Sequence, residues 1–151
     1  MPKTWKEKLL FSKNLPCVFK VKKAMLGAKV GDKMVIPLPT EYDEQMRKIP
    51  FGEVKTVPEL REFFAKKYKA DITCPLTAGI FVNVVAHAAE EAALADAKDT
   101  TPWWRTVKKD GELNEKYPGG IEGHAQRLSL EGHRIVKKGK RVFVDLASTR
   151  T

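Results

Sequence analysis

Residues 49–59 read Ile49-Pro50-Phe51-Gly52-Glu53-Val54-Lys55-Thr56-Val57-Pro58-Glu59. Pro50-Phe51-Gly52 ends one predicted helix, and Thr56 begins the next, because threonine followed three residues later by glutamate forms a capping box. Proline is tolerated in the first turn of a helix. Apolar residues then recur at helical spacing, at Val57, Leu60, Phe64 and Tyr68. We expect this helix to pack on a core in which Phe63 and Phe64 are both buried.

Further elements are predicted on both sides of this segment. Upstream, we expect a short helix over residues 4–11, a strand over 17–21 and an extended segment over 34–39. Thr40 is the predicted N-cap of a helix that carries Tyr42, Met46 and Ile49 on one face. Downstream, residues 75–95 predict a long and mostly buried helix. Its apolar side carries Leu76, Ile80, Val84, Ala88 and Ala92, and Phe81 and Val85 widen this stripe.

The C-terminal part predicts a short helix and a hairpin. The helix is expected over residues 121–131, and strands over 133–136 and 141–146 flank the basic turn Lys137-Lys138-Gly139-Lys140. Three helices followed by a hairpin is the order of a winged helix-turn-helix. We therefore expect an α+β fold, with residues 1–35 as an N-terminal extension packed on a main domain that comprises residues 36–151.

The composition excludes several classes of protein. The most apolar run, residues 74–89, is interrupted by polar residues and is too short to span a membrane, and no signal peptide is recognisable. Cys17 and Cys74 have no metal-ligand spacing and predict free thiols in a reducing cytoplasm. Three scattered histidines predict no metal site: His87 is expected in the core, and His124 and His133 at the surface. No cofactor motif occurs.

The net charge of +9 suggests nucleic acid as a partner, but its distribution is uneven. Residues 1–50 contain 11 basic and 5 acidic side chains, residues 51–100 contain 6 and 8, and residues 101–151 contain 11 and 6. The basic character therefore lies in the two ends of the sequence. The predicted helix over 75–95 has no Lys or Arg and carries Glu90 and Glu91, which disfavours direct contact between that helix and DNA.

Five short strings together resemble the C-terminal domain of the O6-alkylguanine-DNA alkyltransferases. They are Ile49-Pro50-Phe51-Gly52-Glu53-Val54, Pro102-Trp103-Trp104-Arg105, Asp110-Gly111, Tyr117-Pro118-Gly119-Gly120 and Leu130-Glu131-Gly132-His133. The family has similar strings in the same order, and the resemblance spans residues 40–137. It implies a winged-helix domain of the alkyltransferase C-terminal type.

The resemblance also implies that alkyl transfer is lost. The family's reactive cysteine and the histidine beside it correspond to Trp103 and Trp104, and an indole supplies no thiolate nucleophile. Glu131 matches the glutamate that orients the histidine and is expected to lack that partner. Cysteine-lacking members, the alkyltransferase-like proteins, bind O6-alkylguanine DNA and mark it for repair. The chain resembles these non-enzymatic members of the family.

The same resemblance implies a pocket for a flipped base. Its candidate residues are Trp103, Trp104, Arg105, Tyr117 and Glu131. Each has a structural alternative: the two tryptophans would fill the former active site as core, Arg105 would brace the motif from inside, and Glu131 would be a scaffold contact.

The basic hairpin supplies the candidate contacts to the DNA backbone, which are Lys137, Lys138, Lys140 and Arg141. A solvated charged turn is the alternative. Two family residues that handle DNA, a tyrosine and an arginine, correspond here to Val57 and to Thr77 or Leu76. Two hypotheses follow. The chain binds double-stranded DNA without catalysis and acts with a repair protein, or it is a repurposed scaffold that binds a protein partner or a small ligand.

Overall fold

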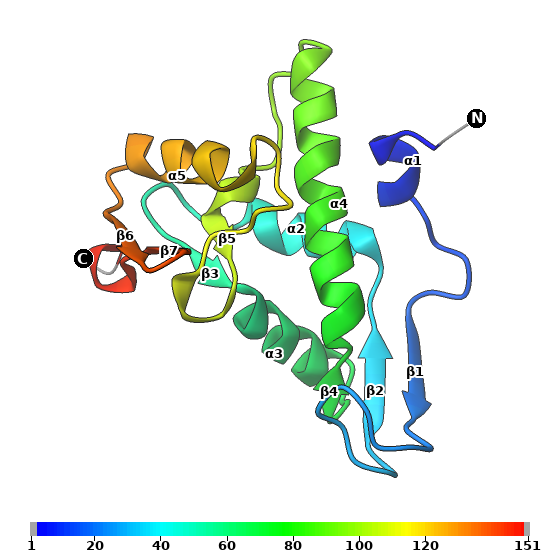
Figure 1. Ribbon diagram of the computed structural model, residues 1–151. Coiled ribbons are helices and arrows are strands. Elements are labelled where there is room, and N and C mark those ends of the chain that lie inside the picture. The colour runs from blue at the N-terminus through cyan, green and yellow to red at the C-terminus, as the bar shows by residue number, and fades with distance from the viewer. Residues whose placement is uncertain (1–2, 150–151) are drawn as a thin grey trace.

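A computed structural model describes residues 3–149, and it has the expected mixed α+β architecture (Figure 1). Its α-helices are α1 Trp5–Leu9, α2 Pro39–Arg47, α3 Val57–Lys67, α4 Pro75–Leu94 and α5 Gly120–Leu130. Its 3₁₀ helices are η1 Trp103–Arg105, η2 Lys109–Gly111 and η3 Leu146–Thr149. Its strands are β1 Cys17–Lys20, β2 Lys33–Ile36, β3 Lys55–Thr56, β4 Ile72–Thr73, β5 Thr106–Val107, β6 Ile135–Lys138 and β7 Arg141–Val144.

The strands form three small sheets. The first has the order β1-β2-β4, the second pairs β3 with β5 in parallel, and the third is the antiparallel hairpin β6-β7. The predicted hairpin is present, but its turn is shorter than predicted: Lys137 and Lys138 belong to β6, with Lys138 opposite Arg141. Gly139 has a positive φ in the turn. The β3–β5 pair places Thr56 opposite Val107. The start of α3 is thereby held beside the segment that follows Trp103-Trp104-Arg105.

Helix α4 is the centre of the molecule. In Figure 1 it stands upright, with α1, β1 and β2 on one side and α5 and the hairpin on the other. The main core joins side chains of α2 and α3 to small residues of α4, whose short side chains let the helices approach closely. It includes Tyr42, Met46, Leu60, Phe64, Ala78, Val82, Val85, Ala86 and Ala89.

Helix α3 begins where the capping box predicts. The Thr56 Oγ1 atom accepts a hydrogen bond of 3.3 Å from the backbone N–H of Glu59, and Leu60 and Phe64 are buried. Phe63 was expected in the core, but it is exposed. Adjacent residues on a helix point about 100° apart, so the helix that buries Phe64 turns Phe63 toward solvent.

Helix α2 begins earlier than predicted. Leu38, not Thr40, is the N-cap, because Pro39 occupies the first helical position and Glu41 turns back to accept a 2.8 Å hydrogen bond from the Leu38 N–H. The buried residues Tyr42 and Met46 lie on the expected face.

The buried face of α4 matches the predicted one only in part. Val84, Val85 and Ala88 are buried as expected, but Leu76 and Ile80 are 60% and 50% exposed. The core contact is completed by Ala78, Val82 and Ala89. The helix is apolar on almost every side, so its periodicity selects no single face. Among residues 3–149, no helix combines the length and the apolar character needed to cross a membrane.

The N-terminal segment is tied to α4 by specific bonds. The backbone N–H groups of Trp5 and Lys6 each donate to the Glu91 carboxylate at 3.2 Å, and the Trp5 ring stacks on His87 at 4.5 Å. Strand β2 spans the predicted boundary at residues 35 and 36, and the division into an extension and a main domain remains a prediction. Residues 1–2 and 150–151 of those predicted segments lie outside the described residues.

Candidate functional site

The segment Pro102–Arg105 lies where distant parts of the chain meet. Its residues form η1, which packs on both α4 and α5 and leads directly into β5. The Nη1 atom of Arg105 donates a 2.9 Å hydrogen bond to the carbonyl oxygen of Ile49, the first residue of the string that opens the family resemblance. The fold thus brings together two motifs that are 56 residues apart in the sequence.

All five candidate pocket residues meet at this point, together with two that the sequence analysis did not single out as site residues. We call the whole group the two-tryptophan cluster; it comprises Glu90, Trp103, Trp104, Arg105, Tyr117, Arg127 and Glu131. The free thiols Cys17 and Cys74 lie elsewhere, in β1 and immediately before α4.

Trp103 fills the interior of this cluster. Its side chain is buried, since the residue is 2% exposed, and its ring meets those of Tyr117 and Trp104 edge to face at 5.3 and 5.5 Å. Its Nε1–H donates to Oε1 of Glu90 at 3.2 Å. The indole therefore has no open face for a base to stack on in this conformation. Trp103 thus packs as a core residue, which is the structural alternative to lining a base pocket. A role for Trp103 in stacking on a flipped base remains a prediction.

Glu131 bonds to no histidine, as expected, but its carboxylate is held by Trp104 and Arg105, as the scaffold alternative predicts. The Nε1–H of Trp104 donates to Oε2 of Glu131 at 2.8 Å, and Arg105 donates to both carboxylate oxygens, from Nε to Oε1 at 3.0 Å and from Nη2 to Oε2 at 2.9 Å. The indole N–H of Trp104 is thus one of the donors that hold the Glu131 carboxylate. Burial raises the pKa of Glu131, but the hydrogen bonds from Arg105 and Trp104 outweigh it and lower the pKa overall.

Arg127 is a member of the cluster that sequence reasoning missed. Its guanidinium lies 4.7 Å from the centre of the Trp104 ring and donates from Nη2 to Glu90 at 2.9 Å. Arg127 covers Trp104 through a cation–π contact and links α5 to α4. The one signal in the sequence was its spacing, since Arg127 stands four residues before Glu131 and so shares a helical face with it.

His124 was expected at the surface but is fully buried beneath the cluster. Its Nε2–H donates to the carbonyl oxygen of Trp104 at 2.8 Å, so the neutral ring keeps Nδ1 free to accept the N–H of Asn114 at 3.1 Å. A second proton on the ring would sit on Nδ1 and point at the Asn114 N–H, so the hydrogen bond between them would be lost. Burial lowers the pKa of His124 to about 4, although its bond to Trp104 opposes the shift. The neutral imidazole satisfies two backbone groups that would otherwise be buried without partners.

The other two histidines also differ in part from expectation. His133 is buried rather than at the surface, and burial lowers its pKa. His87 is only half-buried, but it is satisfied, because its Nε2 bonds to the carbonyl oxygen of Lys116 at 2.7 Å. Histidine burial is poorly signalled by sequence, because it depends on backbone groups that tertiary structure brings close.

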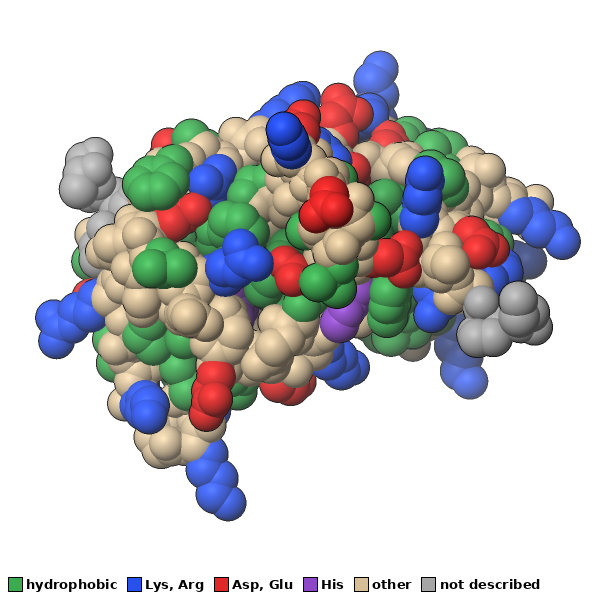
Figure 2. Space-filling view, turned by 90° about the horizontal axis from the view of Figure 1, so that it is seen from above, with side chains coloured by type: hydrophobic (Ala, Val, Ile, Leu, Met, Phe, Trp, Pro, Cys, Tyr) green, Lys and Arg blue, Asp and Glu red, His purple; other side chains and the backbone are tan. Residues whose placement is uncertain are grey.

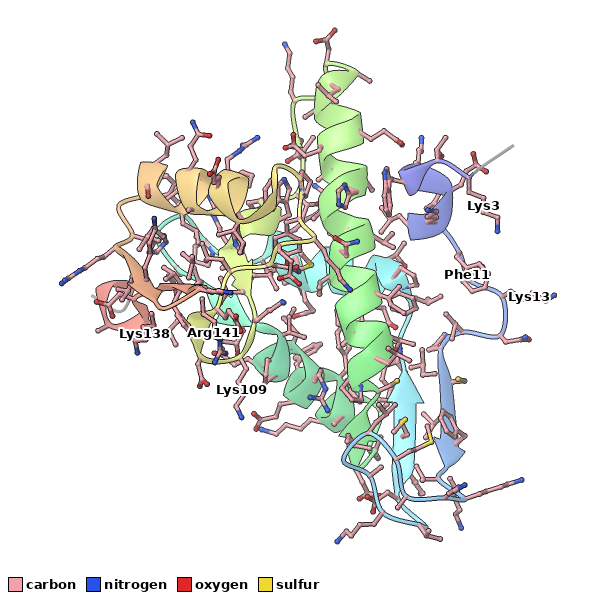
Figure 3. All side chains as sticks on the ribbon, in the orientation of Figure 1. Lys3, Phe11, Lys13, Lys109, Lys138 and Arg141 are labelled. Carbon is pink, nitrogen blue, oxygen red and sulfur yellow. The ribbon has the colours of Figure 1, made fainter. Side chains whose placement is uncertain are left out.

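The basic hairpin residues are all exposed, but they differ in their partners. Arg141 donates two hydrogen bonds to Glu112, at 3.1 and 2.9 Å, so its charge is largely balanced. Lys138 and Arg141 both lie over the Phe143 ring, at 5.5 and 5.1 Å. In Figure 3, Lys138 and Arg141 lie on the same side of α3 as Lys109, at the opposite edge of the molecule from Lys3 and Lys13.

Basic side chains do not collect over a single element. Figure 2, viewed toward the C-terminal end of α4, shows Lys and Arg spread over this face and its rim, with acidic side chains between them. The separation of basic residues in the sequence is therefore kept in space, with one group near the hairpin and another on the N-terminal segment.

Solved structures show a similar arrangement of elements. No model of a known protein family matches the chain, and no curated protein matches it. The S. pombe alkyltransferase-like protein in complex with DNA superimposes with a TM-score of 0.53 at 20% identity, over 74% of this chain and 91% of that one. The chain has the alkyltransferase-like fold. S. pombe Atl1 with damaged DNA containing O6-carboxymethylguanine gives a TM-score of 0.51 at 19% identity, with the same coverage. The alkyltransferase-like fold thus accounts for about three quarters of the chain.

Proposed function

We propose that the chain is an alkyltransferase-like protein that binds double-stranded DNA without transferring an alkyl group. The observation that carries this proposal is the two-tryptophan cluster. Trp103 and Trp104 occupy the motif where the resemblance places the cysteine and histidine, inside a fold shared with a protein crystallised on DNA. A repair protein that recognises the bound complex is the further proposed partner, and the cytoplasm the proposed compartment.

The chemistry of the cluster supports a non-catalytic role. Alkyl transfer needs a thiolate held close to the alkyl carbon, and the pKa of a cysteine must be lowered by neighbouring charges for it to react at neutral pH. The nitrogen of each indole instead donates a hydrogen bond to a glutamate, Trp103 to Glu90 and Trp104 to Glu131. With Cys17 and Cys74 outside the cluster, no acceptor of the required type is present in it.

The hairpin β6-β7 is the proposed wing of a winged helix. Lys137, Lys138 and Lys140 are exposed at its tip, where a phosphate backbone can approach without desolvating buried groups. Such contacts release condensed counterions, so each one steepens the decrease of affinity with salt.

Lesion recognition by base flipping is the finer part of the proposal. Trp104 is the half-buried indole, and the Arg127 guanidinium lies over its ring. A flipped O6-alkylguanine would stack on Trp104 after displacing Arg127, and stacking of one base on an aromatic ring contributes about 1–3 kcal/mol. Trp103 would then support Trp104 from within the core.

The test is fluorescence anisotropy of labelled duplexes, with and without one O6-methylguanine, at several salt concentrations. We expect tighter binding of the modified duplex, and loss of that preference in Trp104→Ala. The triple variant K137Q/K138Q/K140Q should weaken binding of both duplexes and reduce the salt dependence. The control K20Q/K22Q/K23Q removes the same charge from exposed lysines at the end of β1 and should have a smaller effect.

A repurposed scaffold is the second candidate function, and one observation favours it. A cavity of about 380 Å³ lies between α1, α2 and α4, with an apolar floor that includes Ala88, Ala89 and Ala92 and a charged rim that includes Asp43 and Arg47. Its size suits a small ligand with an apolar body. Absence of DNA binding at low salt would eliminate the first proposal and leave this cavity as the site to study.

A further inference from the structure

Strand β1 forms one edge of the sheet β1-β2-β4. It pairs with β2 on one side, and in Figure 1 it lies at the outer edge of the molecule, on the far side of β2 from α4. In an antiparallel pair, alternate residues direct their backbone N–H and C=O groups away from the partner strand. The outer side of β1 is therefore a row of backbone groups that a second extended chain can reach.

The register of the sheet shows which groups point outward. The N–H of Cys74 donates to the carbonyl oxygen of Val35 at 3.0 Å, so Val35 directs its backbone groups toward β4. Val18 lies opposite Val35 and directs its own groups away from β2, and Lys20 follows the same alternation. Within residues 3–149, no group bonds to the outward N–H and C=O of Val18 and Lys20.

Apolar side chains are exposed along this edge. Val18 and Phe19 of β1 are 44% and 39% exposed. The loop that follows the strand exposes three more, Met25, Leu26 and Val30. Five of the thirteen exposed large hydrophobic side chains in the described part of the chain therefore lie in one short segment, which marks it as a contact surface.

The same segment is strongly basic. Residues 12–33 contain one acidic residue, Asp32, and six exposed lysines, namely Lys13, Lys20, Lys22, Lys23, Lys29 and Lys33. The Asp32 carboxylate accepts a 2.8 Å hydrogen bond from the backbone N–H of Lys29. The lysine side chains that form salt bridges in the described chain are other ones. The positive charge around β1 is therefore available to an acidic partner.

We propose that β1 accepts an acidic, extended peptide segment of a partner protein as an added strand. In such complexes main-chain hydrogen bonds give affinity, and alternate side chains give specificity. Phosphate groups of DNA or of a lipid surface would match the lysines, but they cannot donate to the outward carbonyl oxygens of Val18 and Lys20. A peptide backbone supplies both donors and acceptors.

The lysines also disfavour a second copy of this chain at the edge. Pairing two β1 strands would bring like charges together, and lysine on an edge strand opposes such self-association. The surface lies outside residues 40–137, which carry the family resemblance, and its role is independent of the proposed DNA binding.

The probe is a short fluorescein-labelled peptide in which valine and threonine alternate at the centre and glutamates stand at both ends. Two control peptides are matched to it. One has lysines in place of the glutamates, and the other has N-methylated central amides, which cannot donate to a strand. Fluorescence anisotropy measures the affinity of each peptide, and amide hydrogen exchange followed by NMR locates the contact.

Hydrogen exchange distinguishes an added strand from a purely ionic contact. In the free chain, the amides of Val18 and Lys20 should exchange quickly, whereas that of Val21, whose N–H donates to the Asp32 carbonyl oxygen at 2.8 Å, should be protected. The glutamate peptide should slow exchange at Val18 and Lys20. Both control peptides should bind about ten-fold more weakly.

Three variants test the location. Val18→Pro removes an outward N–H, and proline is tolerated in an edge strand at such a position, so the variant should fold and bind the peptide about ten-fold more weakly. K20Q/K22Q/K23Q should weaken binding by a similar factor and reduce its salt dependence. K137Q/K138Q/K140Q, which removes the same charge from the hairpin, should bind the peptide as the wild-type chain does. Thermal unfolding confirms that each variant folds.

Several results would overturn the added strand. They are failure of the glutamate peptide to bind at low salt, equal binding of the lysine peptide, and binding that leaves Val18 and Lys20 exchanging freely. Binding to anionic vesicles alone would assign the surface to a membrane. Protection of the two amides that rises with protein concentration in the free chain would assign it to a second copy. The same variants measured with duplex DNA should show the reverse ranking, so failure of DNA binding and failure of peptide binding are distinguishable.

Discussion

The Nε1–H of Trp104 donates to the Glu131 carboxylate at 2.8 Å, and the same carboxylate receives two further hydrogen bonds from Nε and Nη2 of Arg105. The glutamate thus keeps a ring donor on one side and a guanidinium on the other. Because Arg105 also bonds to Ile49, this glutamate links the end of α5, the η1 motif and the segment after α2. One carboxylate therefore ties together three segments that are far apart in the sequence.

Removing this carboxylate should destabilise the fold. In Glu131→Ala the largely buried guanidinium of Arg105 is left without its counter-ion, and breaking such a pair typically costs about 3–5 kcal/mol. Glu131→Gln retains an acceptor for Trp104 and should lose less. The measurement is the free energy of unfolding in urea. Glu44→Ala, which breaks an exposed pair with Lys48, is the control and should change stability by less than about 1 kcal/mol.

Trp103 should be a major contributor to stability because it is 2% exposed and central to the core. Trp103→Ala leaves a large cavity and removes one of the donors to the Glu90 carboxylate, and a loss of about 3–5 kcal/mol is expected. Trp103→Phe should lose less, since it keeps most of the aromatic volume. The midpoint of thermal unfolding ranks the variants. If Trp103→Ala unfolded at the same temperature as the wild-type chain, the Trp103 ring would not be packed in the core as described.

Stability should fall with acid in a window set by His124. The folded pKa of about 4 lies below the unfolded value of about 6.5, so the unfolded chain binds a proton more tightly than the folded chain between these pH values. This contribution is complete above pH 6.5 and lost as the pH falls toward 4, by about 3 kcal/mol. His124→Gln retains a donor and an acceptor but does not titrate. Urea unfolding at a series of pH values should give a flatter profile for this variant, and identical profiles would assign the slope to other groups.

The attachment of α1 should depend on Glu91. Its carboxylate accepts hydrogen bonds from the N–H groups of Trp5 and Lys6 at the start of that helix, and loss of such a cap costs about 1 kcal/mol. Glu91→Ala should increase hydrogen exchange over residues 5–9 without changing exchange in α3. Glu62→Ala, which breaks an exposed pair with Lys66, serves as the control. Equal protection of α1 in wild type and Glu91→Ala would show that the Trp5–His87 stack is sufficient.

No alkyl group should move to the protein. After incubation with a duplex containing O6-methylguanine, intact-protein mass spectrometry should show only the unmodified chain, because the indoles of Trp103 and Trp104 carry no thiolate. The chain has two cysteines, Cys17 and Cys74, so a methylated species would be mapped to one of them. Such an adduct, formed only with the lesion duplex, would contradict the non-catalytic assignment.

Local signals in the sequence predicted much of the fold. The capping box at Thr56, the length of α4 and the hairpin around Gly139 depend on residues close together in the chain, and these elements are confirmed. The buried face of α4 was predicted correctly at Val84, Val85 and Ala88 but wrongly at Leu76 and Ile80. Its side chains are apolar on nearly all sides, so the choice between burying Ile80 and burying Val82 is made by tertiary packing.

The candidate site was predicted as a set of residues but not as an arrangement. The five short strings identified Trp103, Trp104, Arg105, Tyr117 and Glu131, which do meet. Arg127 and His124 were not placed there, because no motif marks them. Their roles come from groups 20 or more residues away, namely the Trp104 carbonyl oxygen for His124 and the Trp104 ring and Glu90 for Arg127. Such long-range partners have no signature in a single sequence.

The hydrogen bond between Trp103 and Glu90 also limits which side chains position 103 can accept. A cysteine at position 103 would exchange a large ring for a small side chain, open a void in the core, and leave the Glu90 carboxylate without its indole donor. Arg127, which shares that carboxylate, would lose part of the surface it covers. Each of these contacts favours a tryptophan at position 103. A functional cysteine there would therefore require compensating substitutions at Glu90 and Arg127 as well.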